Sequence, residues 1–333
     1  MRNKIFLIFM LCLSALAFSK SVPVPEWVLD KNSVFPSETY ISALGEGDSK
    51  DRAISEANAG MARYFKTEIQ ANTKASTHAL SDGNNTTFEK KLDTQIEVSS
   101  SVTLSGLEYT TPFYDKKSKK WYCVAFLERE KSWIQFLPAI EKQKADFYAF
   151  FFQAEKESES VLKYALYKKA KISGENFLTA LEYGRIINPK KEESFASDRK
   201  CVNKISCLIE EQKNTFTVFL EISGDYGNFI KSAVSDTLSQ NGFNISKTEN
   251  EANYRAEIIV ENNESGENPI AILPSIDFKI IGKSGKTVLA QQVQAEKKSL
   301  GYRLESAQKK AYPVLAEKAR NTISAGLKKI IGE

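Results

Sequence analysis

The sequence predicts an α+β protein with a helix-on-sheet domain, a helical middle and a second small α+β domain. Three observations carry this prediction. In Glu38–Thr77, an apolar run is followed by two glycines and a long amphipathic stretch. In 132–214, apolar residues recur at helical spacing. In 215–333, strand-like runs alternate with turn residues. The 333 residues are enough for about two domains of roughly 150 residues each. The predicted boundaries are 1–19 for a leader, then 20–131, 132–214 and 215–333.

The first 19 residues predict a secretory signal peptide. Arg2 and Lys4 give it a positive start, residues 5–18 are nearly all apolar, and Ala15-Leu16-Ala17 is a cleavage signal. Cleavage is therefore expected between Ala17 and Lys20. The apolar run is shorter than the roughly 20 residues of a membrane span, so no transmembrane span is expected in the mature chain.

Cys12 raises the alternative of a lipid-modified N-terminus. It lies inside the apolar run, whereas a lipobox cysteine closes such a run behind small residues. We therefore do not expect lipidation at Cys12, and peripheral membrane association stays open.

Net charge excludes one class of partner. Without the leader, the chain keeps 44 basic and 42 acidic side chains, because Arg2 and Lys4 are lost from the 46 basic residues. Such a balance lacks the basic excess that neutralises phosphates, so no nucleic-acid partner is expected.

The first domain, from about Trp27 to Lys131, predicts a strand, a long helix and a strand meander. Tyr40–Leu44 is the first strand, which Gly45-Glu46-Gly47 is expected to end because glycine adopts positive φ cheaply. Phe88–Ser105 fits neither period cleanly. A strand from 107 to 113 then pairs with a central, wholly apolar strand from 121 to 127. The buried helical face comprises Ala53, Ala57, Gly60, Met61, Tyr64, Phe65 and Ile69.

These residues resemble a known family. Pro25-Glu26-Trp27, Ile41–Gly47, a helix with Ala53, Ile54, Ala57 and Ala62, and Trp121–Ala125 occur in an order similar to the Lpp-twenty family. That family is the twenty-kilodalton bacterial surface lipoprotein domain, which is similar to the N-terminal module of flagellar assembly protein T. The resemblance covers about the first third of the mature chain and implies an exported, non-enzymatic envelope protein. The missing lipobox is the departure, and it points to a soluble or peripherally attached form.

The middle predicts a single helical hairpin or short bundle, because no repeat of fixed period is present. Ser173-Gly174 is expected to interrupt the helical pattern and Asn188-Pro189 to stop it. The aromatic stretch Phe147–Phe152 covers more than one helical face. It predicts either burial, which we favour, or a partner-binding surface.

The last domain predicts strands at 215–222, 243–245 and 254–260, a helix through Phe229 and Leu238, and a hairpin of 276–281 with 287–295. A terminal helix runs from Ala307 to Ile330, which Pro313 is expected to kink or restart.

No catalytic, cofactor-binding or metal-binding residues are predicted. Gly282-Lys283-Ser284-Gly285-Lys286-Thr287 is similar to a phosphate-binding loop, but Ile280 stands at the position of its first glycine and no helix follows, so a hairpin turn is expected. Gly45-Glu46-Gly47 lacks the third glycine of a dinucleotide site. His78, the single histidine, is expected to be solvated or capping. The carboxylate pairs Glu192-Glu193 and Glu210-Glu211 are expected to be solvated.

Three cysteines remain after the leader: Cys123, Cys201 and Cys207. The last two lie on a predicted helix, where six residues span roughly 9 Å, beyond the about 7 Å that a disulfide tolerates. We expect reduced, packed thiols.

The sequence as a whole favours a non-enzymatic exported protein of the bacterial envelope, periplasmic or attached to the outer membrane. It would bind envelope proteins through sheet edges or the aromatic middle, without a cofactor. One alternative is a flagellar or secretion-apparatus accessory factor. Another is a cell-wall or glycan hydrolase with two carboxyl groups about 5 to 9.5 Å apart.

Overall fold

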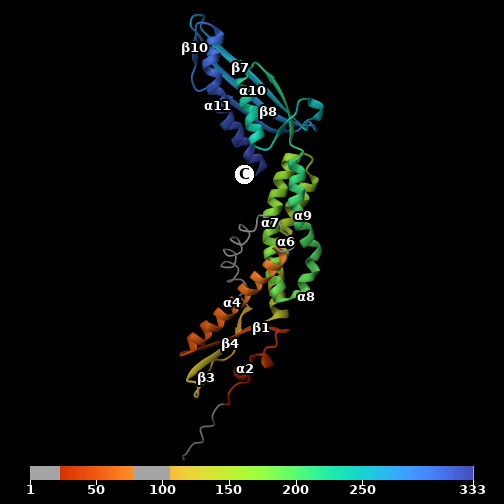
Figure 1. Cartoon of the computed structure of the whole chain (residues 1–333), viewed down its shortest axis with the longest axis vertical. Coiled ribbons are helices and arrows are strands. Elements are labelled where there is room, and N and C mark those ends of the chain that lie inside the picture. The colour runs from red at the N-terminus through yellow and green to blue at the C-terminus, as the bar shows by residue number, and fades with distance from the viewer. Residues whose placement is uncertain (1–22, 78–105, 333) are drawn as a thin grey trace, which may run out of the picture. The chain divides into compact units, whose positions relative to one another are not determined.

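The computed structural model describes residues 23–77 and 106–332 (Figure 1). The predicted leader, the undecided stretch Phe88–Ser105 and His78 lie outside these residues. The chain divides into two compact units, Met1–Phe136 with Ile186–Asn188, and Leu137–Arg185 with Pro189–Glu333. Strands and helices mix in the chain, so the predicted α+β class is confirmed. In the part that the structure describes, no helix is sufficiently long and apolar to span a membrane.

The first unit is a four-stranded antiparallel sheet with one long helix on it. Strand β4 is central, as the sequence predicts, with β1 on one side and β2 and β3 on the other. Helix α4 packs against β1 and β4. The elements are α2 (Glu26–Leu29), α3 (Lys31–Val34), β1 (Tyr40–Gly47), α4 (Lys50–Thr77), β2 (Glu108–Tyr109), β3 (Phe113–Asp115) and β4 (Lys120–Glu128).

The glycines that were expected to end the first strand belong to it instead. Strand β1 continues to Gly47, opposite Trp121, and neither glycine has positive φ. A Cβ on Gly45 would stand 2.1 Å from the Ala53 carbonyl oxygen of α4, closer than any side chain tolerates. The glycines are therefore required for close packing of helix on strand, and the prediction of a turn was wrong.

Three packed helices follow, α6 (Arg129–Lys156), α7 (Ser160–Ile187) and α9 (Ala196–Lys213). They belong to the second unit from Leu137 onward, except for Ile186 and Ile187 at the end of α7. The predicted break at Ser173-Gly174 is wrong, since α7 runs through it. A Cβ on Gly174 would stand 2.7 Å from Val202 Cγ1 and 3.2 Å from the Phe147 ring, so this glycine lets α6 and α9 approach α7. The predicted stop at Asn188-Pro189 is confirmed, with α8 (Pro189–Glu192) and η2 (Glu193–Phe195) following.

A six-stranded mixed sheet with helices on one face completes the second unit. Strands β5, β6 and β7 are parallel, and β8 joins β7 antiparallel and carries β9 and β10 on its other edge. Helices α10 and α11 pack on each other, and α11 covers β8, β9 and β10. The elements are β5 (Thr217–Ser223), α10 (Phe229–Gln240), β6 (Asn244–Ile245), η3 (Glu249–Glu251), β7 (Tyr254–Ser265), β8 (Ile270–Gly282), β9 (Thr287–Gln294), β10 (Ser299–Gly301) and α11 (Leu304–Ile331).

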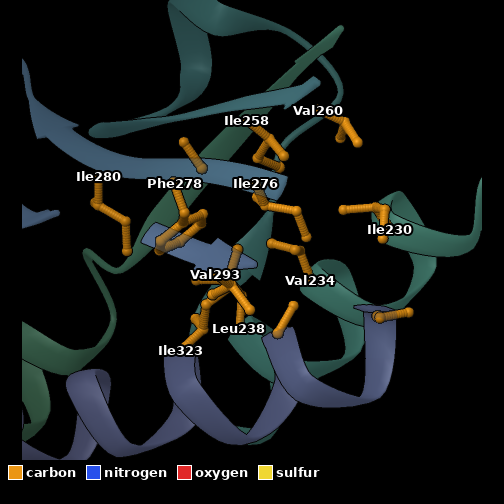
Figure 2. Packing of buried hydrophobic residues seen from close by; sticks show 14 of the residues in the cluster. Ile230, Val234, Leu238, Ile258, Val260, Ile276, Phe278, Ile280, Val293 and Ile323 are labelled. Atoms are coloured by element: carbon orange, nitrogen blue, oxygen red, sulfur yellow. The ribbon is translucent and has the colours of Figure 1, made fainter. Parts of the chain in front are cut away.

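The core between this sheet and its helices is mostly aliphatic, with a few buried aromatic rings such as Phe278 (Figure 2). Alternate residues of β7 and β8, such as Ile258 and Ile276, point toward Val234 of α10 and Ile323 of α11. This alternation is the period-two pattern of strands with one buried face. The hairpin and the terminal helix are confirmed, but Pro313 does not restart α11, which begins nine residues earlier at Leu304.

Candidate functional site

The loop that is similar to a phosphate-binding motif is a hairpin turn between β8 and β9, as predicted. Its backbone amides are already bonded: Gly282 N–H donates to the Lys286 carbonyl at 2.9 Å, Lys283 N–H to Asn253 at 3.1 Å, and Gly285 N–H to Gly282 at 2.9 Å. The Lys286 N–H donates to Ser284 Oγ at 3.1 Å. A phosphate-binding loop keeps such amides free for its ligand, so this turn is not built for phosphate.

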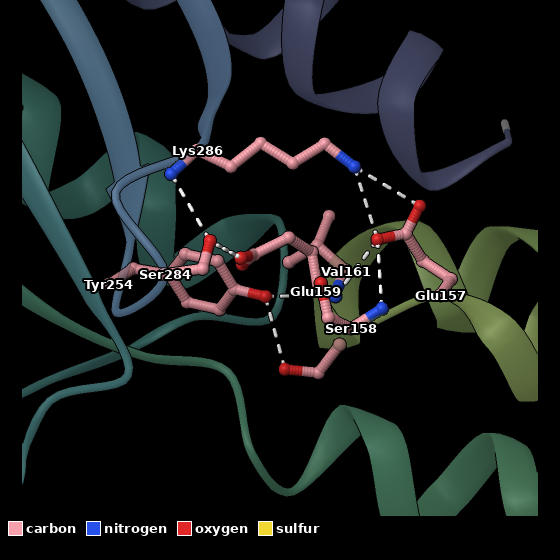
Figure 3. A network of polar contacts seen from close by, with 8 residues as sticks. Glu157, Ser158, Glu159, Val161, Tyr254, Ser284 and Lys286 are labelled. Atoms are coloured by element: carbon pink, nitrogen blue, oxygen red, sulfur yellow. Dashed lines mark hydrogen bonds and ion pairs between the residues drawn. The ribbon is translucent and has the colours of Figure 1, made fainter.

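The side chains of the same turn reach the connection between α6 and α7 (Figure 3). Ser284 Oγ donates a short hydrogen bond to Glu159 Oε1. Lys286 Nζ lies 3.1 and 3.2 Å from the two carboxylate oxygens of Glu157. We call the six residues that meet here the junction network: Glu157, Glu159, Ser160, Tyr254, Ser284 and Lys286.

Glycine is required at the centre of this contact. The side chain of Glu159 is only 5% exposed, and a Cβ on Gly282 would stand 2.0 Å from its Oε2. The bare backbone of Gly282 therefore makes room for the buried carboxylate.

Tyr254, the first residue of β7, completes the network by capping α7. Its hydroxyl oxygen accepts a hydrogen bond from Val161 N–H at 2.9 Å and shares another with Ser160 Oγ at 3.0 Å. The first amides of a helix have no partner within the helix, so a hydroxyl from the sheet satisfies one of them. Val161 itself belongs to the aliphatic core of the C-terminal sheet.

The electrostatics of the network agree with this geometry. Burial acts to raise the pKa of Glu157, but the Glu159 amide and the Lys286 ammonium outweigh it, so that this pKa lies below its ordinary value. Burial also raises the pKa of Tyr254, which keeps the hydroxyl neutral and able both to accept and to donate. The arrangement holds the α6–α7 connection to the C-terminal sheet.

A second polar network links helices α7, α8 and α9. Arg199 of α9 donates to Glu182 at 2.6 Å and makes a short hydrogen bond with Glu192. Burial acts to lower the pKa of Arg199. The hydrogen bonds and charges of Glu182 and Glu192 outweigh burial, so the pKa of Arg199 lies above its ordinary value. The expectation that Glu192 is solvated was wrong, since it is buried against this guanidinium, whereas Glu193, Glu210 and Glu211 are exposed as predicted.

Asp198 makes the remaining link between α6 and α9. Its carboxylate accepts hydrogen bonds from Lys144 Nζ at 2.9 Å and from the Tyr148 hydroxyl at 2.7 Å. Burial, followed by the contact with this carboxylate, raises the pKa of Tyr148.

The aromatic stretch of α6 is buried at one end and exposed at the other. Phe147 is fully buried and its ring lies 6.5 Å from that of Phe177, so burial is confirmed there. Phe152 is 54% exposed and stacks on Tyr148 with ring centroids 5.2 Å apart. One end of the stretch is therefore core and the other is surface.

An open groove of about 500 Å³ lies where the ends of α9 and α10 meet strand β6. Its walls are mostly polar and include Glu210 and Lys213, together with the exposed edge residues Asn244 and Ile245.

The cysteines are free thiols, as expected. Cys123 is buried and Cys201 half-buried, but Cys207 is exposed, so that the expectation of packed thiols was wrong for this residue. Burial raises the pKa of Cys123 and of Cys201. Within residues 23–77 and 106–332, no group of three His, Cys, Asp or Glu side chains could hold a metal ion.

Sequence reasoning missed the residues of the junction network other than those in the turn. Ser158-Glu159-Ser160 precedes the apolar spacing that starts at Val161, and such a polar run is a helix-start signal. It could have located the start of α7. Nothing local indicates that Tyr254, some 94 residues later, supplies the cap.

Comparison with known proteins identifies the N-terminal domain. Residues 25–127 match a family model described as LPP20 lipoprotein, which confirms the resemblance predicted from the sequence over this segment and fits an exported protein. Among solved structures, a minor lipoprotein from Acinetobacter baumannii is 15% identical, with 34% of this chain and 94% of its own covered at a TM-score of 0.25. The secreted protein HP1454 from Helicobacter pylori is 12% identical, with 88% and 98% covered at a TM-score of 0.32. No curated protein matches the chain.

Proposed function

We propose that this protein is a non-enzymatic component of the bacterial cell envelope, in the periplasm or at the outer membrane, that acts by protein–protein contact. The leader sequence and the LPP20 lipoprotein match over residues 25–127 support the envelope location. The similarity of such domains to a flagellar assembly module makes a flagellar or secretion-apparatus accessory role the narrower alternative.

One observation supports a role without catalysis: the turn that is similar to a phosphate-binding loop makes structural contacts inside the fold. Ser284 and Lys286 are the side chains that a phosphate site would use, and each is bonded to a glutamate of the α6–α7 connection. In the helices, Arg199 and Asp198 are likewise bonded to other side chains of the same unit. Groups that a reaction would need free are thus engaged in holding the fold.

A contact role needs exposed apolar surface on a rigid support, and the outer end of the aromatic stretch offers it. Phe152 is exposed on a helix whose inner ring, Phe147, is buried. Aromatic side chains on rigid elements are frequent anchors of protein interfaces. We therefore place one contact with an envelope partner at Phe152.

Site-specific photo-crosslinking in cells tests this placement. A photo-reactive residue at Phe152 should capture a defined envelope protein, while the same residue at Ile172, which is 57% exposed on α7, serves as the matched control. Capture of the same partner at both positions, or at neither, would contradict a contact at Phe152.

The hydrolase alternative is tested on the purified protein. We expect no release of soluble fragments from cell-wall polymer or glycans. Release that disappears when one glutamate, such as the groove residue Glu210, is changed to Gln would refute the non-enzymatic reading. Mass determination of the mature N-terminus checks the export prediction, with cleavage expected between Ala17 and Lys20 and no lipid on Cys12.

A further inference from the structure

Among the strands of residues 23–77 and 106–332, β1 lies at the edge of its sheet, and the direction of its outer backbone groups can be assigned. Its pairing to β4 begins with the Arg129 N–H donating to the Thr39 carbonyl at 2.9 Å. In an antiparallel pair of strands, residues whose backbone groups are hydrogen-bonded to the partner strand alternate with residues whose backbone groups point away from it. Val124, opposite Leu44, confirms the phase, because its N–H and carbonyl are both bonded to Thr110 on the other side of β4.

The backbone groups of Ser42, Leu44 and Glu46 therefore point away from the sheet. The Ser42 carbonyl accepts a hydrogen bond from Lys31 Nζ of α3 at 2.9 Å. In the described part of the chain, the outward N–H and carbonyl groups of Leu44 and Glu46 have no partner. The Leu44 side chain is 42% exposed beside them. A free edge of this kind is a template for another strand.

The charges along this edge are complementary to themselves. Lys31 is half-buried at the Ser42 end, and no carboxylate of the described residues lies within 4 Å of its ammonium. Glu46 lies at the other end and pairs with Lys120 at 2.7 Å. Glu46 lies on the face of the sheet opposite α4, because it alternates with Gly45 and Gly47, which face α4. Helix α3, which carries Lys31, is on the same face, since Phe35 directly after it packs on Phe126 with ring centroids 4.6 Å apart.

We propose that a second copy of this chain pairs with this edge, antiparallel and centred on Leu44, to form a two-fold symmetric dimer. In this register Leu44 exchanges both backbone hydrogen bonds with Leu44 of the second copy, and Ser42 faces Glu46. The carboxylate of Glu46 of the second copy then reaches Lys31, and symmetry forms the same ion pair at the other end. The proposal goes beyond the contact role above and does not depend on any envelope partner.

Lys31 admits an opposite interpretation, in which it guards the edge against association, as lysines on edge strands often do. The two interpretations predict opposite effects of removing its charge. Lys31→Met weakens the proposed dimer, whereas it would strengthen association if Lys31 were a guard.

Sedimentation of the full secreted chain up to about 100 µM tests the proposal, since an interface this small associates only weakly. Leu44→Pro removes an outward N–H without touching the bonds to β4, so it should abolish the dimer and leave the melting temperature nearly unchanged. Lys31→Glu and Glu46→Lys should each lower the association constant about tenfold or more, because each places two like charges together. An equimolar mixture of these two variants should recover the dimer, since both of its ion pairs are again of opposite charge. Val314→Lys, at an exposed site on α11, is the control.

The proposal is overturned by any of four results: a monomer at all concentrations, a dimer that survives Leu44→Pro, stronger association of Lys31→Met, or no recovery in the mixture. A misfolded charge variant would show itself by a lowered melting temperature, and Leu44→Pro then still decides the question.

Discussion

The junction network makes a quantitative prediction about Ser284. Changing Ser284 to Ala removes the hydroxyl that donates to Glu159, whose carboxylate is 5% exposed and has no other donor among the described residues. A hydrogen bond to a charged group contributes about 1.5 to 3 kcal/mol, and burial of the carboxylate favours the upper part of this range. For a unit of about 200 residues, each kcal/mol corresponds to roughly 2 to 4 °C in melting temperature. We therefore expect the melting temperature of the C-terminal unit to fall by about 3 to 12 °C, toward the upper end of this range.

Calorimetry is the suitable assay because the chain divides into two units that need not unfold together. The loss should appear in the transition of the unit that contains Ser284, while the transition of the N-terminal unit stays in place. Ser232→Ala on the exposed side of α10 is the matched control, and it should change the free energy of unfolding by less than about 0.5 kcal/mol.

A double-mutant cycle with Glu159→Gln measures the contact itself. If the hydroxyl and the carboxylate stabilise each other, the loss in the double variant is smaller than the sum of the two single losses by about 1 kcal/mol or more. Additive losses, or a Ser284→Ala variant as stable as the Ser232→Ala control, would refute the reasoning that the turn holds the α6–α7 connection.

Three further predictions concern the packed glycine, the surface ion pair and the thiols. Gly174→Ala should destabilise the bundle by about 1 to 3 kcal/mol in thermal denaturation, although alanine is the better helix former, because its methyl group meets α6 and α9. The pKa of Glu157 is lowered in the folded state, so this carboxylate stabilises the fold at neutral pH and loses that effect as the pH falls below its ordinary pKa near 4.5. Lys286→Met should make the free energy of unfolding, measured in urea, less dependent on pH in this range. Cys207 should react with a thiol reagent in the folded protein, whereas Cys123 should react only after unfolding, as mass spectrometry can show.

Most of the fold could be predicted from residue spacing, because helices and strands bury one face at fixed periods. The central strand β4 and the terminal helix α11 were identified in this way. Two of the errors concern glycine. Gly45 and Gly174 were read as conformational breaks, but each is required where another helix comes within contact of its backbone. Local sequence cannot distinguish a glycine that breaks a helix or strand from one that permits close packing, because the difference lies in which distant residues pack against it.

The site was harder to predict than the fold for the same reason. The hairpin turn was recognised from its own residues, but its partners Glu157 and Glu159 lie some 125 to 129 positions earlier. A polar run before Val161 could indicate a helix start and not the strand residue that caps it. Likewise Glu192, next to the exposed Glu193, is buried only because α9 brings Arg199 to it.

The turn between β8 and β9 illustrates why residue types alone do not determine a chemistry. Glycine, serine and lysine suit a phosphate because they offer close approach, a hydroxyl and a positive charge. A pair of carboxylates has the same requirements, and here the chain supplies them itself: Gly282 makes room, Ser284 donates and Lys286 neutralises. The carboxylate of Glu159 belongs to the same chain and is always present beside Ser284. An anion from solution would have to compete with Glu159 for the Ser284 hydroxyl, and by winning it would leave the buried carboxylate without a donor. In this fold the side chains of the motif are bonded to Glu159 and Glu157, and they connect the α6–α7 segment to the C-terminal sheet.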